Sequence, residues 1–227
     1  MNYNIKITEA KNEKSKAKAY AMVVFDRKIA VRNISIVERK DGTGVFVSMP
    51  SQQIAGKTDE LGNPMYKDTC HPITAEFQQE FSAAILRAYE MFKDRVLPLD
   101  GFTVGDSKEP MKYSASVALK ENPTGNVIAS ANVYLEDSFV ISGVNLIKNN
   151  RGGVFPSMPA YRTGGKDGKD YDYHDIAYPI TKEFREELFG TLINEYKEKK
   201  DVKEKEAREA VDGRAGAVSE RESVPFR

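Results

Sequence analysis

The chain carries an internal repeat, and this feature limits its possible folds more than any other. Ala19–Val37 (AYAMVVFDRKIAVRNISIV) is similar to Ala129–Ile147 (ASANVYLEDSFVISGVNLI) at an offset of 110 residues. The segments GVFVSMPS from Gly44 and GVFPSMPA from Gly153 follow at an offset of 109. Because similar motifs recur in the same order, we predict two copies of one structural unit.

Each copy begins with a pattern that is typical of consecutive antiparallel strands. Three stretches rich in β-branched and apolar residues alternate with turn residues, at 3–8, 19–25 and 29–37 in one copy and at 113–119, 129–135 and 139–147 in the other. In the third stretch the alternation breaks phase at Arg32-Asn33 and at Ser142-Gly143. This break predicts a β-bulge in each copy. A short Gly-Val-Phe strand and a polar loop follow.

A third pair of motifs leads into a helix in each copy: YKDTCHPIT from Tyr66 and YHDIAYPIT from Tyr173, at an offset of 107. Thr74 and Thr181 are predicted N-caps, each with a glutamate in the first turn. Behind them one apolar residue recurs every four positions, at Phe77, Phe81, Ile85 and Tyr89 and at Phe184, Leu188, Leu192 and Tyr196. This spacing predicts one amphipathic helix per copy.

We therefore predict an α+β fold of two repeats, each an antiparallel β-meander followed by one amphipathic helix. Units of this size have small cores, so the two are expected to pack together as an intramolecular pseudo-dimer. The predicted boundaries are 1–95 for repeat 1, 96–110 for a linker rich in proline and glycine, 111–196 for repeat 2 and 197–227 for a charged tail. The tail is predicted to be helical to about Ala210 and disordered beyond it, with a partner-binding segment as the alternative.

Charge and composition narrow the possible functions. Thirty-four Lys and Arg residues balance thirty-four Asp and Glu residues, so nucleic-acid binding would require a local basic patch on a neutral body. No apolar run approaches the roughly 20 residues of a membrane span, and the N-terminal segment lacks the apolar stretch of a signal peptide. The single cysteine, Cys70, fits a reducing compartment. These features predict a cytoplasmic protein that does not contact a membrane.

Nothing in the sequence predicts catalysis. Asp68 and Asp175 are the acidic residues that both copies keep among their matched motifs, and neither has a matched histidine, cysteine or second carboxylate nearby. His71 and His174 do not align with each other, and no zinc or nucleotide motif is present. We predict no catalytic residue, no metal, no cofactor and no enzymatic activity.

The two conserved motifs resemble those of the stage V sporulation protein G (SpoVG) family. That family has a Gly-Leu-Phe-Val-Ala-Met-Pro-Ser-like strand and turn, a basic loop, and an Arg-Asp-Ile-x-His-Pro-Ile step into its helix. The resemblance covers Tyr3–Phe92 and, in a more diverged form, Tyr113–Tyr196. It implies a bacterial regulator that is linked to sporulation septation, cell division and gene regulation, forms homodimers and binds DNA and RNA. The tandem copies would then form the dimer within one chain, and a further homo-oligomer is possible.

The resemblance also implies where nucleic acid would bind. The basic positions that correspond to the family's loop and helix start are Lys57, Lys67, Arg162, Lys166, Lys169, His174, Lys182 and Arg185. Tyrosines near the loops are candidates for stacking on single-stranded bases: Tyr66, Tyr161, Tyr171 and Tyr173. The acidic residues at both helix starts depart from the family's basic helix. They leave a second hypothesis open: a protein-interaction or assembly module that keeps the fold without binding nucleic acid.

Overall fold

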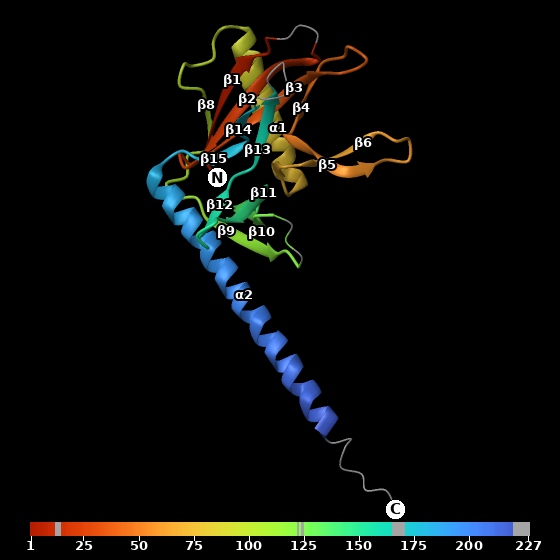
Figure 1. Ribbon diagram of the computed structural model, residues 1–227. Coiled ribbons are helices and arrows are strands. Elements are labelled where there is room, and N and C mark those ends of the chain that lie inside the picture. Colours follow the sequence, from red (N-terminus) through yellow and green to blue (C-terminus); the bar gives the residue numbers. More distant parts are fainter. Residues whose placement is uncertain (12–14, 122, 124, 165–170, 220–227) are drawn as a thin grey trace, which may run out of the picture.

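The computed structural model describes residues 1–11, 15–121, 123, 125–164 and 171–219 (Figure 1). For residues 55, 163, 164, 171 and 210–219 the description is limited to the backbone. The predicted α+β fold of two similar halves is confirmed, since each half forms antiparallel strands and then one helix. The two helices are α1 (Ala75–Lys93) and α2 (Lys182–Ser219).

Each repeat contains a four-stranded antiparallel meander. Repeat 1 is built from β1 (Tyr3–Glu9), β2 (Ala17–Phe25), β3 (Ile29–Glu38) and β4 (Val45–Ser48). Repeat 2 is built from β9 (Tyr113–Leu119), β10 (Val127–Leu135), β11 (Phe139–Lys148) and β12 (Val154–Ser157). The central hairpin turns by two residues with positive φ in both copies, Asp26 and Arg27 in one and Glu136 and Asp137 in the other. Such left-handed pairs suit the twist of a tight hairpin.

The two sheets exchange a strand. A three-residue strand of repeat 1, β7 (Cys70–Pro72), pairs with β11 of repeat 2. Its counterpart in repeat 2, β15 (Ala177–Pro179), pairs with β3 of repeat 1. The flanking amides continue the pairing, since Ile73 N donates to Ser138 O and Ile180 N donates to Lys28 O, both at 2.8 Å. The exchange makes each sheet a product of both repeats, which is the structural form of the predicted pseudo-dimer.

Both predicted β-bulges are confirmed, and they lie where the exchanged strands end. In the pairing of β2 with β3, Ala21 faces Ile34 and Val23 faces Val31, so one residue of β3 is extra. The same shift occurs between β10 and β11. The bulged positions Asn33 and Gly143 have φ values of 66° and 77°, a left-handed conformation that asparagine and glycine tolerate best.

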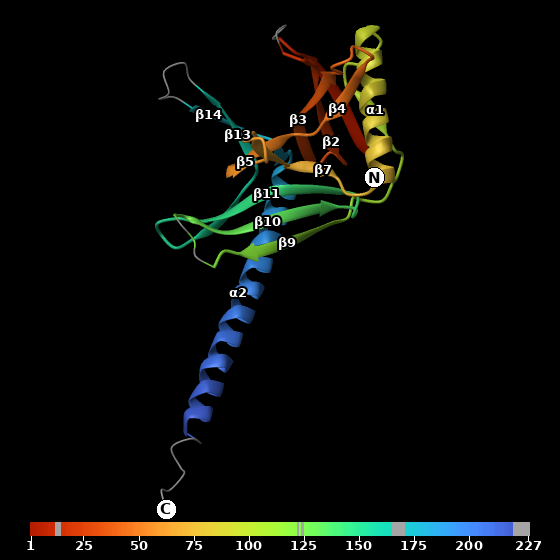
Figure 2. The same cartoon turned by 90° about the vertical axis from the view of Figure 1, so that its right-hand side faces the viewer.

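The helices cover the sheets through the predicted faces. Thr74 and Thr181 cap them, because their hydroxyls accept hydrogen bonds at 3.2 Å from Phe77 N and Phe184 N. The buried residues of α1 are Phe81, Ile85, Ala88 and Tyr89, and those at the start of α2 are Phe184, Leu188 and Leu192. In Figure 2, α1 lies against the sheet of repeat 1 and the first turns of α2 lie against that of repeat 2.

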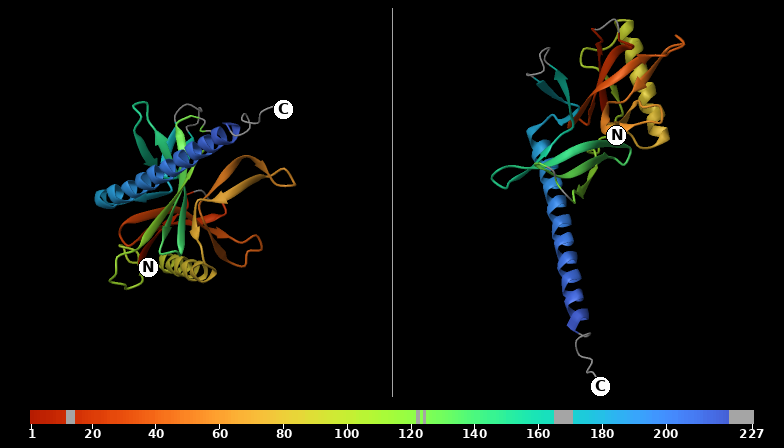
Figure 3. Two further views of the ribbon diagram at one scale, coloured as in Figure 1. Left: turned by 90° about the horizontal axis from the view of Figure 1, so that it is seen from below. Right: turned by 45° about the vertical axis from the view of Figure 1, so that its right-hand side comes forward.

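Two segments differ from the sequence-based expectation. The linker 96–110 contains a strand, β8 (Phe102–Val104), which pairs with β1 and extends the edge of the first sheet. Helix α2 continues past Ala210 to Ser219 and projects from the body of the protein (Figures 1 and 3). All described side chains between Lys197 and Glu209 are exposed, so this part of the helix is stabilised locally. The ion pairs Lys200–Glu204 and Lys205–Glu209, at 3.4 and 4.0 Å, contribute to that local stability.

Candidate functional site

The segments expected to be polar loops are two-stranded hairpins, which we call the arms. Arm 1 consists of β5 (Ser51–Thr58) and β6 (Pro64–Asp68), and arm 2 consists of β13 (Ala160–Gly164) and β14 (Tyr171–Asp175). The loop prediction was wrong because the described side chains of both arms are exposed or only partly buried, so they give no alternation of buried and exposed residues that would signal a strand. The arms leave the body in different directions (Figure 3).

Arm 1 places its predicted residues on two faces. Lys67 lies opposite Gln52, and Tyr66 lies opposite Gln53, so that the lysine and the tyrosine point to opposite sides of the hairpin. Tyr66 is 61% exposed. Lys57 lies near the end of β5 and is also exposed. The side chains of all three residues are therefore accessible to a ligand. Their role in binding remains a prediction.

Arm 2 brings four predicted residues into two cross-strand pairs. Arg162 lies opposite Tyr173, which is 71% exposed. On the other face Tyr161 lies opposite His174, with ring centroids 5.5 Å apart and ring planes inclined by 32°. A cation beside an exposed aromatic ring on one surface can contact a phosphate and a base together. Two further predicted positions, Lys166 and Lys169, lie outside the described residues. For a third, Tyr171, only the backbone is described.

The two basic residues predicted at the helix start lie apart from the arm pairs. Lys182 and Arg185 belong to the first turn of α2, and β15 separates them from arm 2 along the chain. Both are exposed, and Lys182 Nζ lies 3.8 Å from Glu186 Oε1. An exposed ion pair of this kind contributes little to stability. The neighbouring glutamates nevertheless offset the positive charge of Lys182 and Arg185, so this turn is not a strongly positive surface.

Sequence reasoning missed one basic cluster, which lies between the end of β11 and residues 196–201 of α2. A cavity of about 360 Å³ is lined by Lys148 from the end of β11 and by Tyr196, Lys197, Lys200 and Asp201 of α2. Lys148 also borders a second hollow beside Arg151 and Phe155. The cluster joins residues roughly 50 positions apart, so only the placement of α2 against β12 creates it.

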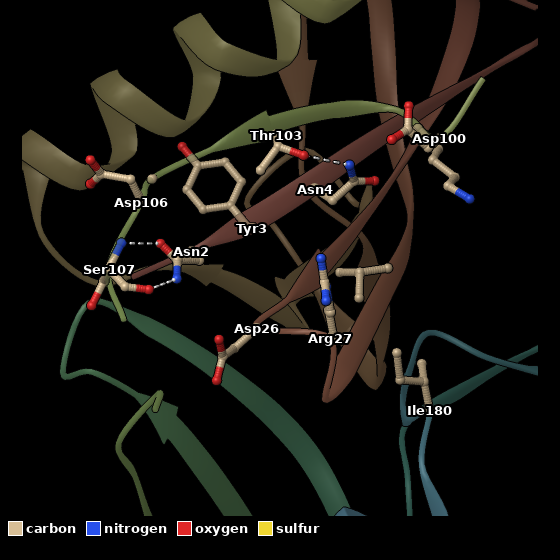
Figure 4. Close-up of a pocket in the computed structure, with 13 residues that line it drawn as sticks. Asn2, Tyr3, Asn4, Asp26, Arg27, Asp100, Thr103, Asp106, Ser107 and Ile180 are labelled. Carbon is tan, nitrogen blue, oxygen red and sulfur yellow. Dashed lines mark hydrogen bonds between the residues drawn. The ribbon is translucent and has the colours of Figure 1, made fainter. Parts of the chain in front are cut away.

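A surface groove beside the inter-repeat segment is explained by the fold and not by a ligand. It has a volume of about 640 Å³ and lies beside β1, β8 and the turn after β2 (Figure 4). The side chain of Asn2 both donates to and accepts from the backbone of Ser107, and Asn4 Nδ2 donates to Thr103 Oγ1. These bonds attach the inter-repeat segment to β1, so the polar groups at the base of the groove serve the fold.

The described residues form no metal-binding cluster, and the single thiol of the chain is buried. Among them no group of three His, Cys, Asp or Glu side chains lies close enough to hold a metal ion. Cys70 is fully buried, and burial raises the pKa of its thiol well above the usual range, which disfavours the reactive thiolate. Within the part of the chain that the structure describes, no helix combines the length and the apolarity needed to cross a bilayer.

The chain therefore has an α+β body in which each repeat contributes one strand to the other repeat's sheet, and two hairpin arms project from this body. The SpoVG family model matches residues 1–91 and 113–198, well over half of the chain, and matches it twice. This chain belongs to the SpoVG family, as a tandem member with two family units.

Individual relatives match over the length of about one repeat. A protein of Treponema denticola named "Putative septation protein SpoVG" is 36% identical over 81 residues, which is 36% of this chain and 75% of the relative. One from a Thermoanaerobacter species is 36% identical over 84 residues, 37% of this chain and 82% of the relative. A third, from Borreliella afzelii, is 35% identical over 85 residues, 37% of this chain and 78% of the relative.

Proposed function

We propose that this chain is a non-enzymatic regulatory protein of the SpoVG type that binds DNA or RNA through its arms. The relatives' names connect the family to septation, and the proposal extends that role and a cytoplasmic location to this chain. The observation that carries the proposal is the pair Arg162 and Tyr173, which lie opposite each other on an exposed face of arm 2. A guanidinium can contact phosphate while the ring beside it stacks on a base.

The neutral net charge limits how such a protein binds. A body without a basic excess gains little from long-range attraction, so binding depends on the few cations at the contact surface. Arm 2 supplies the cation Arg162 and the imidazole of His174, and arm 1 supplies the cations Lys57 and Lys67. We propose that the two arms contact separate stretches of one strand, since both project from one body whose sheets are cross-paired.

The proposal is tested by fluorescence-anisotropy titration of the intact chain with single-stranded RNA and with duplex DNA at two salt concentrations. Micromolar or tighter binding that weakens with salt is expected, because each neutralised phosphate contributes to the salt dependence. An arm-2 variant, R162E with H174E, and an arm-1 variant, K57E with K67E, should each weaken binding and reduce the salt slope. The matched control, K112E with K120E, changes two exposed lysines outside the arms. It should lower the affinity for the probes less than either arm variant does.

A protein-interaction module is the second candidate, and the tip of arm 1 favours it. Leu61 is 87% exposed and Met65 is 42% exposed. Asp59 holds this tip rigidly, because its carboxylate accepts hydrogen bonds from Leu61 N and Asn63 N at 2.9 and 2.8 Å. If neither probe binds at low salt, the nucleic-acid proposal fails and the interaction module becomes the better description.

A further inference from the structure

Each arm joins the body beside the bulge of the other repeat, and we call this junction the foot of the arm. The same backbone hydrogen bond forms at both junctions. Arg32 N donates to Ile176 O at 2.8 Å, and the corresponding Ser142 N donates to Thr69 O at 2.7 Å. The side chains at the bulges differ greatly in size, however, because arginine and asparagine in repeat 1 correspond to serine and glycine in repeat 2.

In repeat 1 the chain fills the space beside its bulge with a planar group. Arg32 Nε donates to Asp175 O at 2.5 Å. The guanidinium lies over the ring of Tyr178, 4.9 Å from the ring centroid. A flat hydrogen-bonding group therefore occupies the foot of arm 2, held by one carbonyl and one aromatic face.

At the corresponding place in repeat 2 the space is open. A cavity of about 190 Å³ lies between Ser142-Gly143 and the foot of arm 1, where Gln52, Lys67 and Asp68 line it. This volume is below the roughly 300–1,000 Å³ of pockets for drug-sized ligands and suits a single ring system. His71 is the counterpart of Tyr178 in the repeat, but it is not among the described residues that line this cavity, so no aromatic ring among them fills the space as Tyr178 does in repeat 1.

The lining chemistry distinguishes among flat ligands. The Lys67 ammonium donates hydrogen bonds, and so does the Gln52 amide, whose Nε2 already donates one to Ala160 O at 3.0 Å. The Asp68 carboxylate and the amide oxygens accept hydrogen bonds. A second guanidinium would donate only and would lie beside the positive charge of Lys67. A nucleobase is flat and presents donors and acceptors on one edge, so it uses both kinds of lining group.

We infer that the cavity at Ser142-Gly143 binds one unstacked nucleobase of a single strand, and this inference rests on the proposed function. The base that fits best carries an exocyclic amino group for Asp68 and a carbonyl for Lys67 or Gln52, which describes guanine and cytosine. The exposed ring of Tyr66 lies on the other face of the same arm from Lys67, so it is not part of this pocket. The strand-exchanged repeats therefore have different roles, since only the repeat 2 bulge leaves its pocket open.

The test compares uracil-only RNA strands with strands that carry a single central guanine, cytosine or adenine, each titrated against the intact chain. The guanine or cytosine strand should bind about tenfold more tightly than the uracil-only strand. S142R places in the cavity the residue that fills the equivalent space in repeat 1. It should remove this preference while the affinity for the uracil-only strand stays equal or rises, because a positive charge is added.

Two further variants separate the pocket from general effects. S116R adds the same charge at an exposed position on β9 and should keep the base preference. D68N removes one acceptor from an exposed residue of the lining, and should reduce the preference even if S142R does not fold. Equal binding of all strands, or a preference that survives D68N and S142R, overturns the pocket alone. Failure of every strand to bind at low salt overturns the proposed function and the pocket together.

Discussion

The ring of Phe25 in repeat 1 lies 4.9 Å from the ring of Phe139 in repeat 2, centroid to centroid, with the planes inclined by 45°. Phe81 of α1 completes the cluster, since its ring is 5.5 Å from Phe139 and 6.0 Å from Phe25. All three side chains are fully buried. The hydrophobic core is therefore continuous between the repeats, and neither half has a core of its own that excludes the other.

Replacing Phe139 by alanine should lower the free energy of unfolding by about 3–5 kcal/mol, the cost of a large cavity in a core. Because the cluster belongs to both repeats, we expect one cooperative transition in urea at a lower midpoint, with both repeats unfolding together. Circular dichroism and tyrosine fluorescence should report the same midpoint. The matched control is F155A, because Phe155 lies on β12 and is 44% exposed. This substitution should lower the free energy of unfolding much less. Two separate transitions in F139A would contradict the shared core.

The meanders, bulges, helix caps and helix faces were all predictable from the sequence, because each leaves a local signal that occurs twice. The strand exchange was not. Strands β7 and β15 have three residues each, too few to show alternation, and the choice of a partner strand in the other repeat is a long-range property. Strand β8 was hidden for the same reason in a segment rich in proline and glycine.

The candidate site was predictable only in part. The exposed positions of Tyr66, Arg162 and Tyr173 follow from their polar surroundings, but their pairing across arm strands does not. The open cavity beside Ser142 depends on a comparison of two bulges in space, and the basic cluster at Lys148 depends on where α2 lies. No local pattern reports either arrangement.

We expect glycine to be required at position 143 because of the backbone conformation there, and not because a larger side chain would clash with its neighbours. Its φ is +77°, whereas a Cβ added there would meet Pro159 and Thr69 side-chain atoms at ordinary distances of 3.7 and 3.8 Å. G143A should therefore lower the free energy of unfolding by about 1–2 kcal/mol through left-handed strain. G143N should cost less, because Asn33 adopts the same conformation in repeat 1. Urea unfolding checks both variants, and N33G serves as a nearly neutral control. Equal stability of G143A and G143N would contradict this explanation.

Cys70 reports the opening of the exchanged strand. It pairs with Ile141 in β11, its side chain is fully buried, and burial raises the pKa of its thiol. A disulfide reagent at about pH 8 should react far more slowly with the folded chain than with the urea-unfolded chain, since the thiolate forms only after opening. I141A should increase the rate by loosening this pairing. Equal rates in the folded and unfolded chains would show that β7 does not protect the thiol.

The same thiol gives a prediction for the pH dependence of stability. The pKa of Cys70 in the folded chain lies above its ordinary value of 9.0, so the neutral thiol stabilises the fold at lower pH. As pH rises above 9.0 the unfolded chain ionises first, and the free energy of unfolding should fall. C70A should lose this part of the alkaline dependence in urea titrations at successive pH values. An unchanged alkaline slope in C70A would assign the dependence to other groups.

The tip of arm 1 should lose its order in acid. Hydrogen bonds from Asn63 and Leu61 lower the pKa of Asp59 below its ordinary value of 3.8. The carboxylate therefore stabilises the turn fully above pH 3.8, and this stabilisation is lost as pH falls through the lower pKa of the folded state. NMR shifts of the Leu61 and Asn63 amides should follow that acidic midpoint. D59A should lack the transition and show faster amide exchange at the tip at every pH, whereas E60A, at the exposed neighbour, should behave as the parent chain. A midpoint at or above pH 3.8, or tip amides that are unchanged in D59A, would mean that Asp59 does not hold Leu61 in its exposed position. Either result would weaken the structural support for arm 1 as an interaction surface.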